Sequence, residues 1–213
     1  MRFDLDDLPE RTAYKLLAAT TVPRPIAWVV TQDAAGRRNA APYSFFNVMG
    51  SAPPTVTLGL MAGPHGPKDT ARNIAETGEF VVNLVPEPMV EAMNLTSADA
   101  PPGVDELAAA GLGTLPSAHV APPRIAGSPV AYECRRLHMV ETGPAQFVVI
   151  GQVVAVHIED RFLKDVERAH VDTPALDLVA RGYGSTYIRA RDSFELDRPT
   201  WAGLLAAGRV RAD

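Results

Sequence analysis

Runs of β-branched and aromatic residues, separated by Gly and Pro, recur along most of the chain. These runs predict strands over residues 25–32, 37–49, 55–61, 79–85, 129–141 and 146–160. The turn DAAG (33–36) joins the first two runs, which is the pattern of a hairpin. The last run is too long for a flat strand, and Gly151 within it predicts a bend or a bulge.

Helical patterns are short and stand between these strands. They cover residues 9–19, 70–77 and 87–97. Pro9 suits the first position of the first helix, and Gly78 suits the end of the second. Residues 98–128 are rich in Pro, Gly and Ala and predict a long irregular excursion. Because strands and helices do not alternate regularly, we expect a mainly antiparallel β-barrel with helical insertions and not a doubly wound parallel sheet.

Length and composition indicate one globular domain. The chain has 213 residues, of which 46% are hydrophobic and 21% are charged. These proportions are ordinary for a globular protein and do not suit a disordered one. We therefore expect a single domain over residues 1–213, with a core from about residue 14 to 190 and a polar, exposed tail from about 191 to 213.

Several classes of function are not expected. A net charge of −5 without a basic run argues against nucleic-acid binding. The lone Cys134 excludes an internal disulfide, and the five scattered histidines include no H-E-x-x-H pair, so we expect no metal site. His138 and His157 are interpreted as structural residues of predicted strands. No apolar run is long enough to cross a membrane and the N-terminus does not resemble a signal peptide, so we expect a cytoplasmic protein.

The stretch GPHGPKDTARNIAET (63–77) passes abruptly from Gly and Pro into a helical pattern. It is not a phosphate loop of the nucleotide-binding type, because Pro67 precedes Lys68 and Asp69 occupies the Ser/Thr position. A helix N-terminus still attracts anions, and Lys68 and the hydroxyl of Thr70 would add a charge and a donor. Asp69 is interpreted as a helix cap. A capped helix with a solvated lysine is the alternative interpretation.

A second polar group lies in NAAPYSFFN (39–47). Asn39, Ser44 and Asn47 are candidates for polar contacts with a flat ring, with Phe45 or Phe46 packed behind it. An aromatic-rich core strand is the alternative. Upstream, prolines flank Arg24 and stiffen its backbone. A fixed arginine suits a phosphate or the polar edge of a ring.

Eight motifs in order make the chain resemble the flavin reductase-like family of flavoredoxin-type proteins. They are PRPIAWVVT, NAAPYSFFN, PPTV, KDTARNI, TGEFVVNLV, AGLGTLPS, SPVAYEC and IGQVVAVHIED. The resemblance covers roughly residues 14–190. It implies an FMN-binding split β-barrel that forms a homodimer, with flavin sites near the subunit interface. It also implies that NADH or NADPH reduces the flavin, or that bound FMN carries electrons.

The resemblance also implies which residues bind the cofactor. The KDT motif corresponds to Lys68, Asp69 and Thr70, with Lys68 and Thr70 on the FMN phosphate. The remaining implied contacts are Arg24, Pro25, Asn39, Ala41, Ser44, Phe45, Asn47, Arg181 and Tyr187. Arg181 and Tyr187 come from RGYGSTY, where Tyr183 separates the two glycines. No catalytic side chain is expected, since the cofactor performs the chemistry.

Three functions remain open at this point. The first is an NAD(P)H-dependent FMN reductase that feeds a separate oxygenase or another electron acceptor. The second is an FMN-binding electron carrier or flavin-storage protein without reductase turnover. The third is a barrel that binds a different ligand in the same pocket. The residues do not distinguish NADH from NADPH.

Overall fold

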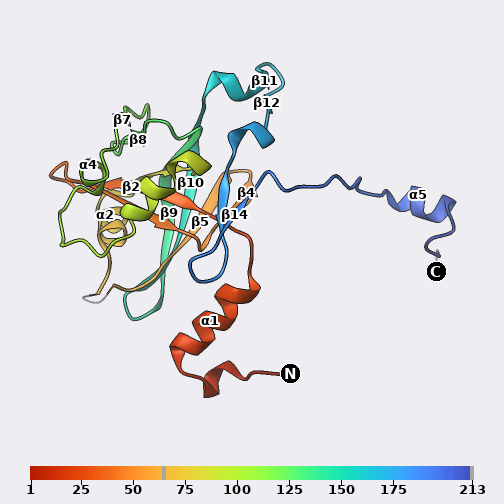
Figure 1. The fold of residues 1–213 in the computed structure, drawn as a ribbon, viewed down its shortest axis with the longest axis horizontal. Coiled ribbons are helices and arrows are strands. Elements are labelled where there is room, and N and C mark those ends of the chain that lie inside the picture. Colours follow the sequence, from red (N-terminus) through yellow and green to blue (C-terminus); the bar gives the residue numbers. More distant parts are fainter. Residues whose placement is uncertain (64–65, 212–213) are drawn as a thin grey trace.

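A seven-stranded antiparallel sheet forms the centre of the computed structural model, which describes residues 1–63 and 66–211 (Figure 1). His65, one of the five histidines, lies outside the described residues. In spatial order the strands are β3 (Arg38–Tyr43), β2 (Ala27–Gln32), β6 (Glu79–Asn83), β9 (Val130–Gly143), β10 (Gln146–Ile158), β5 (Pro54–Leu60) and β4 (Phe46–Ser51). The expected antiparallel architecture is confirmed.

The sheet curls because its two edge strands are adjacent in the chain. The predicted hairpin is confirmed in β2 and β3, where Ala27 pairs with Tyr43. Only Ser44 and Phe45 then separate β3 from β4, which pairs with β5 at the opposite edge. A chain that crosses between edges in two residues brings those edges close together. Within the described residues no hydrogen-bonded ladder joins β3 to β4, so the barrel is split.

The sequence therefore predicted one strand where the structure has two. Residues 37–49 were expected to be continuous, but β3 and β4 belong to opposite edges of the sheet. A propensity pattern contains no information on this change of partner, since both halves are equally β-prone. The bulge expected at Gly151 is confirmed by a shift of register between Ile150 and Gly151.

Smaller strand pairs surround the main sheet. A second sheet has the order β1 (Arg24–Pro25), β13 (Val179–Arg181) and β14 (Tyr187–Arg189). Two short pairs are β7 (Thr114–Leu115) with β8 (Arg124–Ile125), and β11 (Leu163–Asp165) with β12 (His170–Val171). The first of these pairs and a short helix lie in residues 98–128. The expectation of a wholly irregular excursion there was wrong.

The helices are short, as expected, but more numerous than the three that the sequence predicted. The α-helices are α1 (Glu10–Thr20), α2 (Asp69–Thr77), α3 (Val90–Leu95), α4 (Glu106–Ala109) and α5 (Trp201–Ala206). The 3-10 turns are η1 (Leu5–Asp7), η2 (Glu87–Met89), η3 (Asp160–Phe162) and η4 (Pro174–Leu176). Gly78 ends α2 with a φ of 73°, which glycine adopts without strain. No helix in the described part of the chain has the length and hydrophobicity needed to cross a bilayer.

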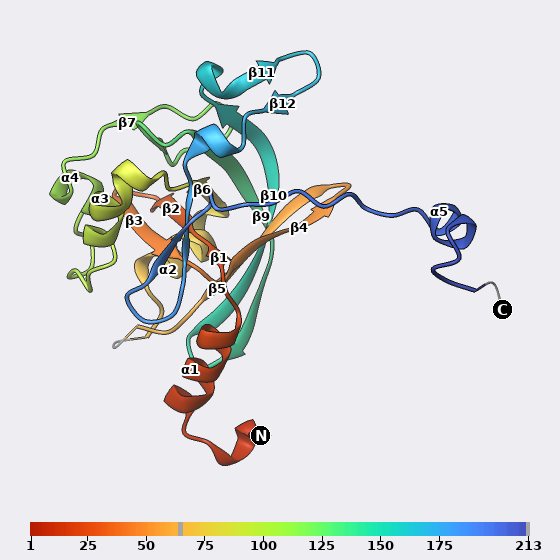
Figure 2. The same ribbon diagram turned by 45° about the vertical axis from the view of Figure 1, so that its right-hand side comes forward.

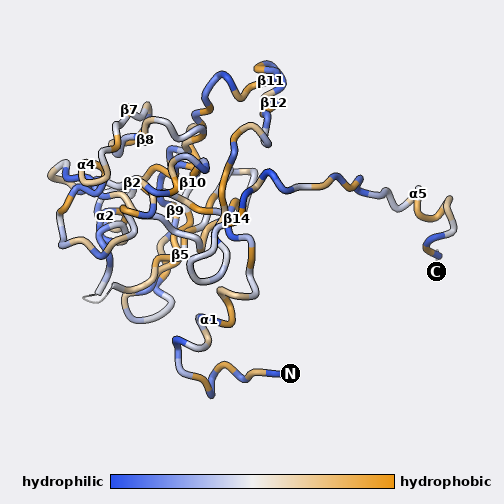
Figure 3. Tube along the Cα trace, in the orientation of Figure 1, coloured by the Kyte–Doolittle hydropathy of each residue, from blue (hydrophilic) through white to orange (hydrophobic). Residues whose placement is uncertain are grey.

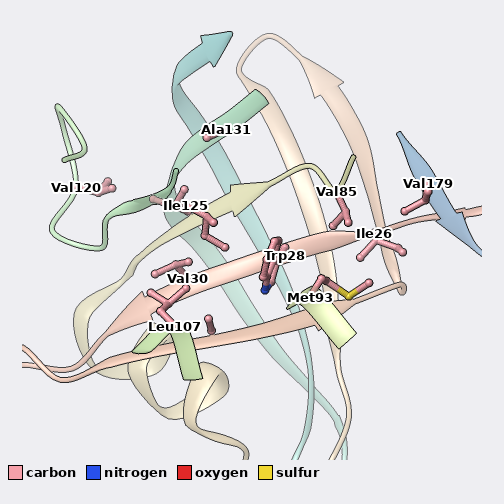
Figure 4. Packing of buried hydrophobic residues seen from close by; sticks show 12 residues of the cluster. Ile26, Trp28, Val30, Val85, Met93, Leu107, Val120, Ile125, Ala131 and Val179 are labelled. Atoms are coloured by element: carbon pink, nitrogen blue, oxygen red, sulfur yellow. The ribbon is translucent and has the colours of Figure 1, made fainter. Parts of the chain in front are cut away.

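The core lies on both faces of β2. Ile26, Trp28 and Val30 pack in one cluster, shown in Figure 4, whereas Ala27 and Val29 face the other. The indole N–H of Trp28 donates to the hydroxyl of Thr96 at 2.9 Å. Since Thr96 follows α3 directly, this buried hydrogen bond fixes the start of the segment 96–102 against the barrel.

Gly151→Ala tests how tightly this core is packed. A Cβ at residue 151 would overlap Cζ of Phe80 and lie 2.9 Å from its Cε1. Phe80 is fully buried and cannot move aside, so we expect the free energy of unfolding to fall by about 1–3 kcal/mol. Urea unfolding measures this. Gly113→Ala, whose Cβ would meet only Ala126 at 3.6 Å, is the control and should unfold like the wild type.

Candidate functional site

The N-terminus of α2 lacks the usual side-chain cap. Lys68 occupies the N-cap position, where Ser, Thr, Asp or Asn is usual, and no side chain accepts a hydrogen bond from the first turn. The backbone N–H groups of Asp69, Thr70 and Ala71 have no acceptor among the described residues. Such N–H groups and the helix dipole favour an anion.

A cavity of about 460 Å³ opens at this helix end. Its walls are the start of α2, the second half of β3, the segment 96–102 and Glu106 of α4. Lys68 stands at its edge, where its Nζ lies 3.2 Å from a carboxylate oxygen of Asp99. Both side chains are substantially exposed, so this ion pair is weak and Lys68 can exchange Asp99 for another anion.

Asn39 connects three elements below the cavity. Its side-chain oxygen accepts a hydrogen bond from the hydroxyl of Thr70 at 2.9 Å. Its side-chain nitrogen donates to both carboxylate oxygens of Glu106, at 3.0 Å each. The backbone N–H of Ala40 donates to the same carboxylate at 3.0 Å. Asn39 thus ties β3 to α2 and to α4 and fixes the shape of the cavity floor.

The Thr70 side chain has a partner within the protein. Thr70 is buried and its hydroxyl donates to Asn39. The backbone N–H of Thr70 is without a partner among the described residues. The main chain of Thr70 is thus open to an anion, and the contact of its hydroxyl with a phosphate stays a prediction.

Asp69 also differs from its expected role. It is the first residue of α2 and not its cap. Its carboxylate pairs with Arg72 and accepts a hydrogen bond from the backbone N–H of Gly103 at 3.2 Å. Asp69 therefore attaches the loop that follows the segment 96–102 to the helix. The interpretation of Asp69 as a helix cap was wrong.

Tyr43 lines the cavity, and its hydroxyl is buried beneath the surface. This hydroxyl has no hydrogen-bond partner among the described residues. Burial raises the pKa of Tyr43 to about 12, the nearby Thr70 hydroxyl lowers it slightly and the charge of Glu106 raises it. Tyr43 is therefore a neutral phenol at physiological pH.

Arg24 is occupied within the protein. It is buried, and its guanidinium donates to the carbonyls of Ala18, Thr21 and Gly182 at 2.5, 2.7 and 2.8 Å and to the Ser44 hydroxyl at 3.3 Å. These bonds hold the end of α1 to β3 and to the β13–β14 loop. The structure thus gives the rigid arginine predicted from its proline neighbours, with its donors directed to the chain.

The other predicted residues lie in different surroundings. Ala41 lines the large cavity together with Asn39. Pro25 and Asn47 line a separate apolar cavity of about 300 Å³. The ring of Phe45 lies 6.0 Å from that of Tyr14, between centroids. The predicted residues at one cavity are thus Asn39, Ala41, Lys68, Asp69 and Thr70.

Arg181 and Tyr187 form a local pair on the second sheet. The guanidinium of Arg181 lies 4.6 Å from the centroid of the Tyr187 ring, which is a cation–π distance. The Tyr187 hydroxyl donates to the side-chain oxygen of Asn94 at 3.2 Å. Neither residue is among the described lining of the large cavity. Their contact with a cofactor stays a prediction.

The sequence analysis missed Tyr43, Asp99 and Glu106. Tyr43 stands inside the motif NAAPYSFFN, where the smaller and more polar neighbours were preferred as contacts. Glu106 follows Asp105, whose carboxylate accepts from the N–H groups of Leu107 and Ala108 at 3.0 and 3.2 Å. This N-cap pattern is visible in DELAAA and would have predicted α4. Nothing local in the sequence indicates that Asp99 pairs with Lys68.

Metal and thiol chemistry have little support in the described residues. No group of three or more His, Cys, Asp or Glu side chains gathers there in a way that could hold a metal ion. Cys134 is buried, and burial raises the pKa of its thiol well above the ordinary value. His157 lies 2.5 Å from the buried carboxylate of Glu133, so it has a structural partner, as expected.

Comparison with known proteins gives a consistent result. The model of the flavin reductase like domain matches residues 19–176. An uncharacterized protein of Deinococcus radiodurans is 45% identical over 206 residues, which are 94% of this chain and 90% of that protein. Component B of nitrilotriacetate monooxygenase from Bacillus cereus is 31% identical with a TM-score of 0.86, covering 92% of this chain and 98% of that one.

A nitroreductase has the same fold over nearly its whole length. The 2-nitrobenzoate 2-nitroreductase of Pseudomonas fluorescens is 33% identical to this chain, with a TM-score of 0.86. The match covers 94% of this chain and 98% of the nitroreductase. The similarity therefore extends over nearly the whole of both chains.

Proposed function

This chain belongs to the flavin reductase-like family, and on that premise we propose that it binds FMN and uses NADH or NADPH to reduce it. The proposal rests on one observation above all. Lys68 and three backbone N–H groups without acceptors among the described residues meet at the mouth of a cavity of about 460 Å³. This is a suitable site for the phosphate of FMN.

Lys68 and the N–H groups at the N-terminus of α2 suit a bound phosphate better than they suit contacts within the chain. A phosphate would accept from the N–H groups of the first turn and attract Lys68 away from Asp99. The chain carries a net charge of −5, so attraction over long distances does not favour an anion. Capture of the phosphate therefore depends on these local groups.

The wall of the cavity fits a flat, partly polar ring. Ala41, Pro42 and Tyr43 provide an apolar strip along β3, and Asn39 and Ser97 are among the polar residues beside it. FMN would supply the chemistry, since flavin accepts a hydride from nicotinamide and passes electrons on. The side chains described here bind and orient the cofactor.

The remaining predicted contacts belong to the same proposal. They are Arg24, Pro25, Ser44, Phe45, Asn47, Arg181 and Tyr187. Ser44, Phe45 and Asn47 continue the chain beyond the apolar strip of β3, and Arg24 holds Ser44 in place. In this proposal Arg24 therefore positions the strand that faces the ring.

The electron acceptor is proposed from the relatives. Component B of a monooxygenase supports a role in which reduced flavin passes to a separate oxygenase. The nitroreductase supports transfer to a small organic acceptor. We propose the first role, in a cytoplasmic homodimer. An FMN-binding electron carrier or storage protein without turnover is the alternative.

An absorbance titration tests the proposal. Adding FMN to the purified protein should shift the visible bands of oxidised flavin, and anaerobic NADH or NADPH should then bleach them. Catalytic oxidation of NADH or NADPH with excess free FMN identifies a reductase. Tight binding without turnover would identify the carrier. A protein that leaves the spectrum of FMN unchanged would contradict both and indicate a different ligand.

A further inference from the structure

The chain ends in an arm that stands away from the barrel. Residues 191–211, here called the C-terminal arm, run without helix or strand to residue 200 and then form α5. Figures 1 and 2 show the arm leaving the body from two directions. All residues from 191 to 200 are exposed. Residues 191–200 have the exposure that was expected of the tail, but its composition is not simply polar.

The arm leaves the barrel in a fixed direction. Arg191 pairs with Glu87, and also with Asp177 at 3.1 Å. Arg189 pairs with Glu87 at 2.5 Å. These three ion pairs hold the root of the arm from two neighbouring positions. The arm is therefore anchored at its base and free beyond it.

Large apolar side chains are exposed along the arm. Phe194 is 89% and Leu196 is 87% exposed, and the alternation with polar neighbours places both on one face of an extended segment. Trp201 is 62% exposed on α5, where Leu204 follows at helical spacing. Figure 3 shows hydrophobic segments alternating with hydrophilic ones along the arm. Soluble chains seldom expose such a series without a partner surface.

A surface that could receive the arm lies at its root. The apolar cavity of about 300 Å³, here called the root groove, is lined by Pro25, Ile26, Val48, Leu84, Val179 and Ala190 among others. Val48 belongs to the edge strand β4 and is 59% exposed. The groove has space for one large side chain such as Phe or Trp.

In each chain the root groove lies at the base of that chain's own C-terminal arm. Ala190 lines the groove, and the next residue begins the arm, which then extends outward (Figure 2). At about 3.3 Å per extended residue, the arm carries Phe194 and Leu196 roughly 13–20 Å beyond Ala190. In this structure the extended arm therefore carries its apolar residues beyond the groove of the same chain.

A second copy of the chain matches both surfaces. We propose that the C-terminal arm of each copy docks at the root groove of the other, with Phe194 inserted in the groove and Leu196 and Trp201 packed against exposed apolar residues of β4 such as Val48. In a dimer with two-fold symmetry this contact occurs twice. Every arm and every groove is then occupied, so the assembly closes as a dimer. A different protein would fill one surface and leave the other exposed. Because Pro25 and Asn47 both line the groove, a docked arm lies against two of the proposed flavin contacts, although the docking itself requires no bound flavin.

The mass in solution tests the docking. Sedimentation equilibrium should give the mass of two chains for the wild type. The double variant Phe194→Ser/Leu196→Ser should dissociate at least tenfold more readily, with an unchanged circular dichroism spectrum because both residues are exposed. Val166→Ser, which changes a residue that is 74% exposed in the β11–β12 turn, should associate like the wild type. A monomeric wild type, or a double variant with wild-type association, would overturn the proposal.

Cross-linking identifies the receiving surface. Cys134 is the single cysteine and is buried, so new cysteines report without interference. A chain with Leu196→Cys is mixed with a second chain carrying Val48→Cys and oxidised with copper phenanthroline. The mixed disulfide should form much faster than between Leu196→Cys and Val166→Cys. Equal rates would show that the arm does not dock at the root groove.

Discussion

Lys68→Ala is expected to weaken the binding of FMN by about 10–100-fold, because a charge-assisted phosphate contact contributes roughly 1.5–3 kcal/mol. The side chain stands at the open end of α2, beside N–H groups that lack acceptors among the described residues. Its removal leaves those N–H groups in place, so binding is weakened and not abolished. Titration of the flavin absorbance measures the dissociation constant.

Two further variants separate phosphate binding from a structural effect. Lys164→Ala is the matched control, because Lys164 is similarly exposed and also pairs with an aspartate, Asp172, at 3.2 Å. It should bind FMN like the wild type. Asp99→Asn frees Lys68 and should leave FMN affinity unchanged or increase it. If Asp99→Asn instead weakens binding as much as Lys68→Ala does, Lys68 acts through its ion pair and not on the phosphate.

Glu133→Gln is expected to lower the free energy of unfolding by about 3 kcal/mol, because it removes a fully buried charged acceptor that is shared by three hydrogen-bond partners. The Glu133 side chain is completely buried. It accepts hydrogen bonds from the N–H groups of Ala118 and His119 at 2.7 and 2.6 Å, and it contacts His157 at 2.5 Å. It thereby fastens the segment 117–121 to β9. Urea unfolding at neutral pH measures the loss.

The same carboxylate gives the protein a predictable acid sensitivity. Burial by itself would raise the pKa of Glu133, but the hydrogen bonds from Ala118, His157 and His119 outweigh it and hold the pKa below its usual value. A folded-state pKa below the unfolded one stabilises the protein above the unfolded pKa of 4.5. This contribution is lost as pH falls through the folded pKa. The difference between wild type and Glu133→Gln should therefore shrink as pH falls below about 4.5.

Glu79→Gln is the control for this stability experiment. Glu79 also holds the same segment, accepting from the N–H of Ala121 at 2.8 Å, but its side chain is partly exposed. We expect its replacement to cost about 1 kcal/mol or less, since water can satisfy the freed group. Equal losses in the two variants would contradict the special role of the buried carboxylate.

The strands of the main sheet and the helices α1, α2 and α3 follow from local patterns. The helix at 70–77 is marked by its Gly/Pro entry and by Gly78, and the structure gives α2 over Asp69–Thr77. The long strands β9 and β10 follow from extended apolar runs, and the bulge follows from Gly151. These features depend on neighbours in the sequence. Local patterns are therefore sufficient to predict them.

The candidate site was predictable only in part. Lys68 could be found because it interrupts a Gly/Pro loop at a helix start, and Asn39 because it belongs to a polar motif. The sequence does not show that these residues lie at one site, since the Asn39–Thr70 hydrogen bond joins residues 31 positions apart. The same holds for Glu106, which reaches Asn39 from an insertion that looked irregular. Side chains that come together only on folding have no fixed spacing along the sequence, so no sequence motif reveals them.

The sequence by itself determined the element types, the antiparallel class and the family, because these depend on propensity, turns and ordered motifs. The tertiary structure decided which residues share the cavity, that β3 and β4 lie on opposite edges, and that the Thr70 hydroxyl serves Asn39. It also decided that Arg24 is bound by carbonyls of the chain. The physical reason is that burial and hydrogen-bond pairing are set by residues distant in sequence, which compete for the same polar groups.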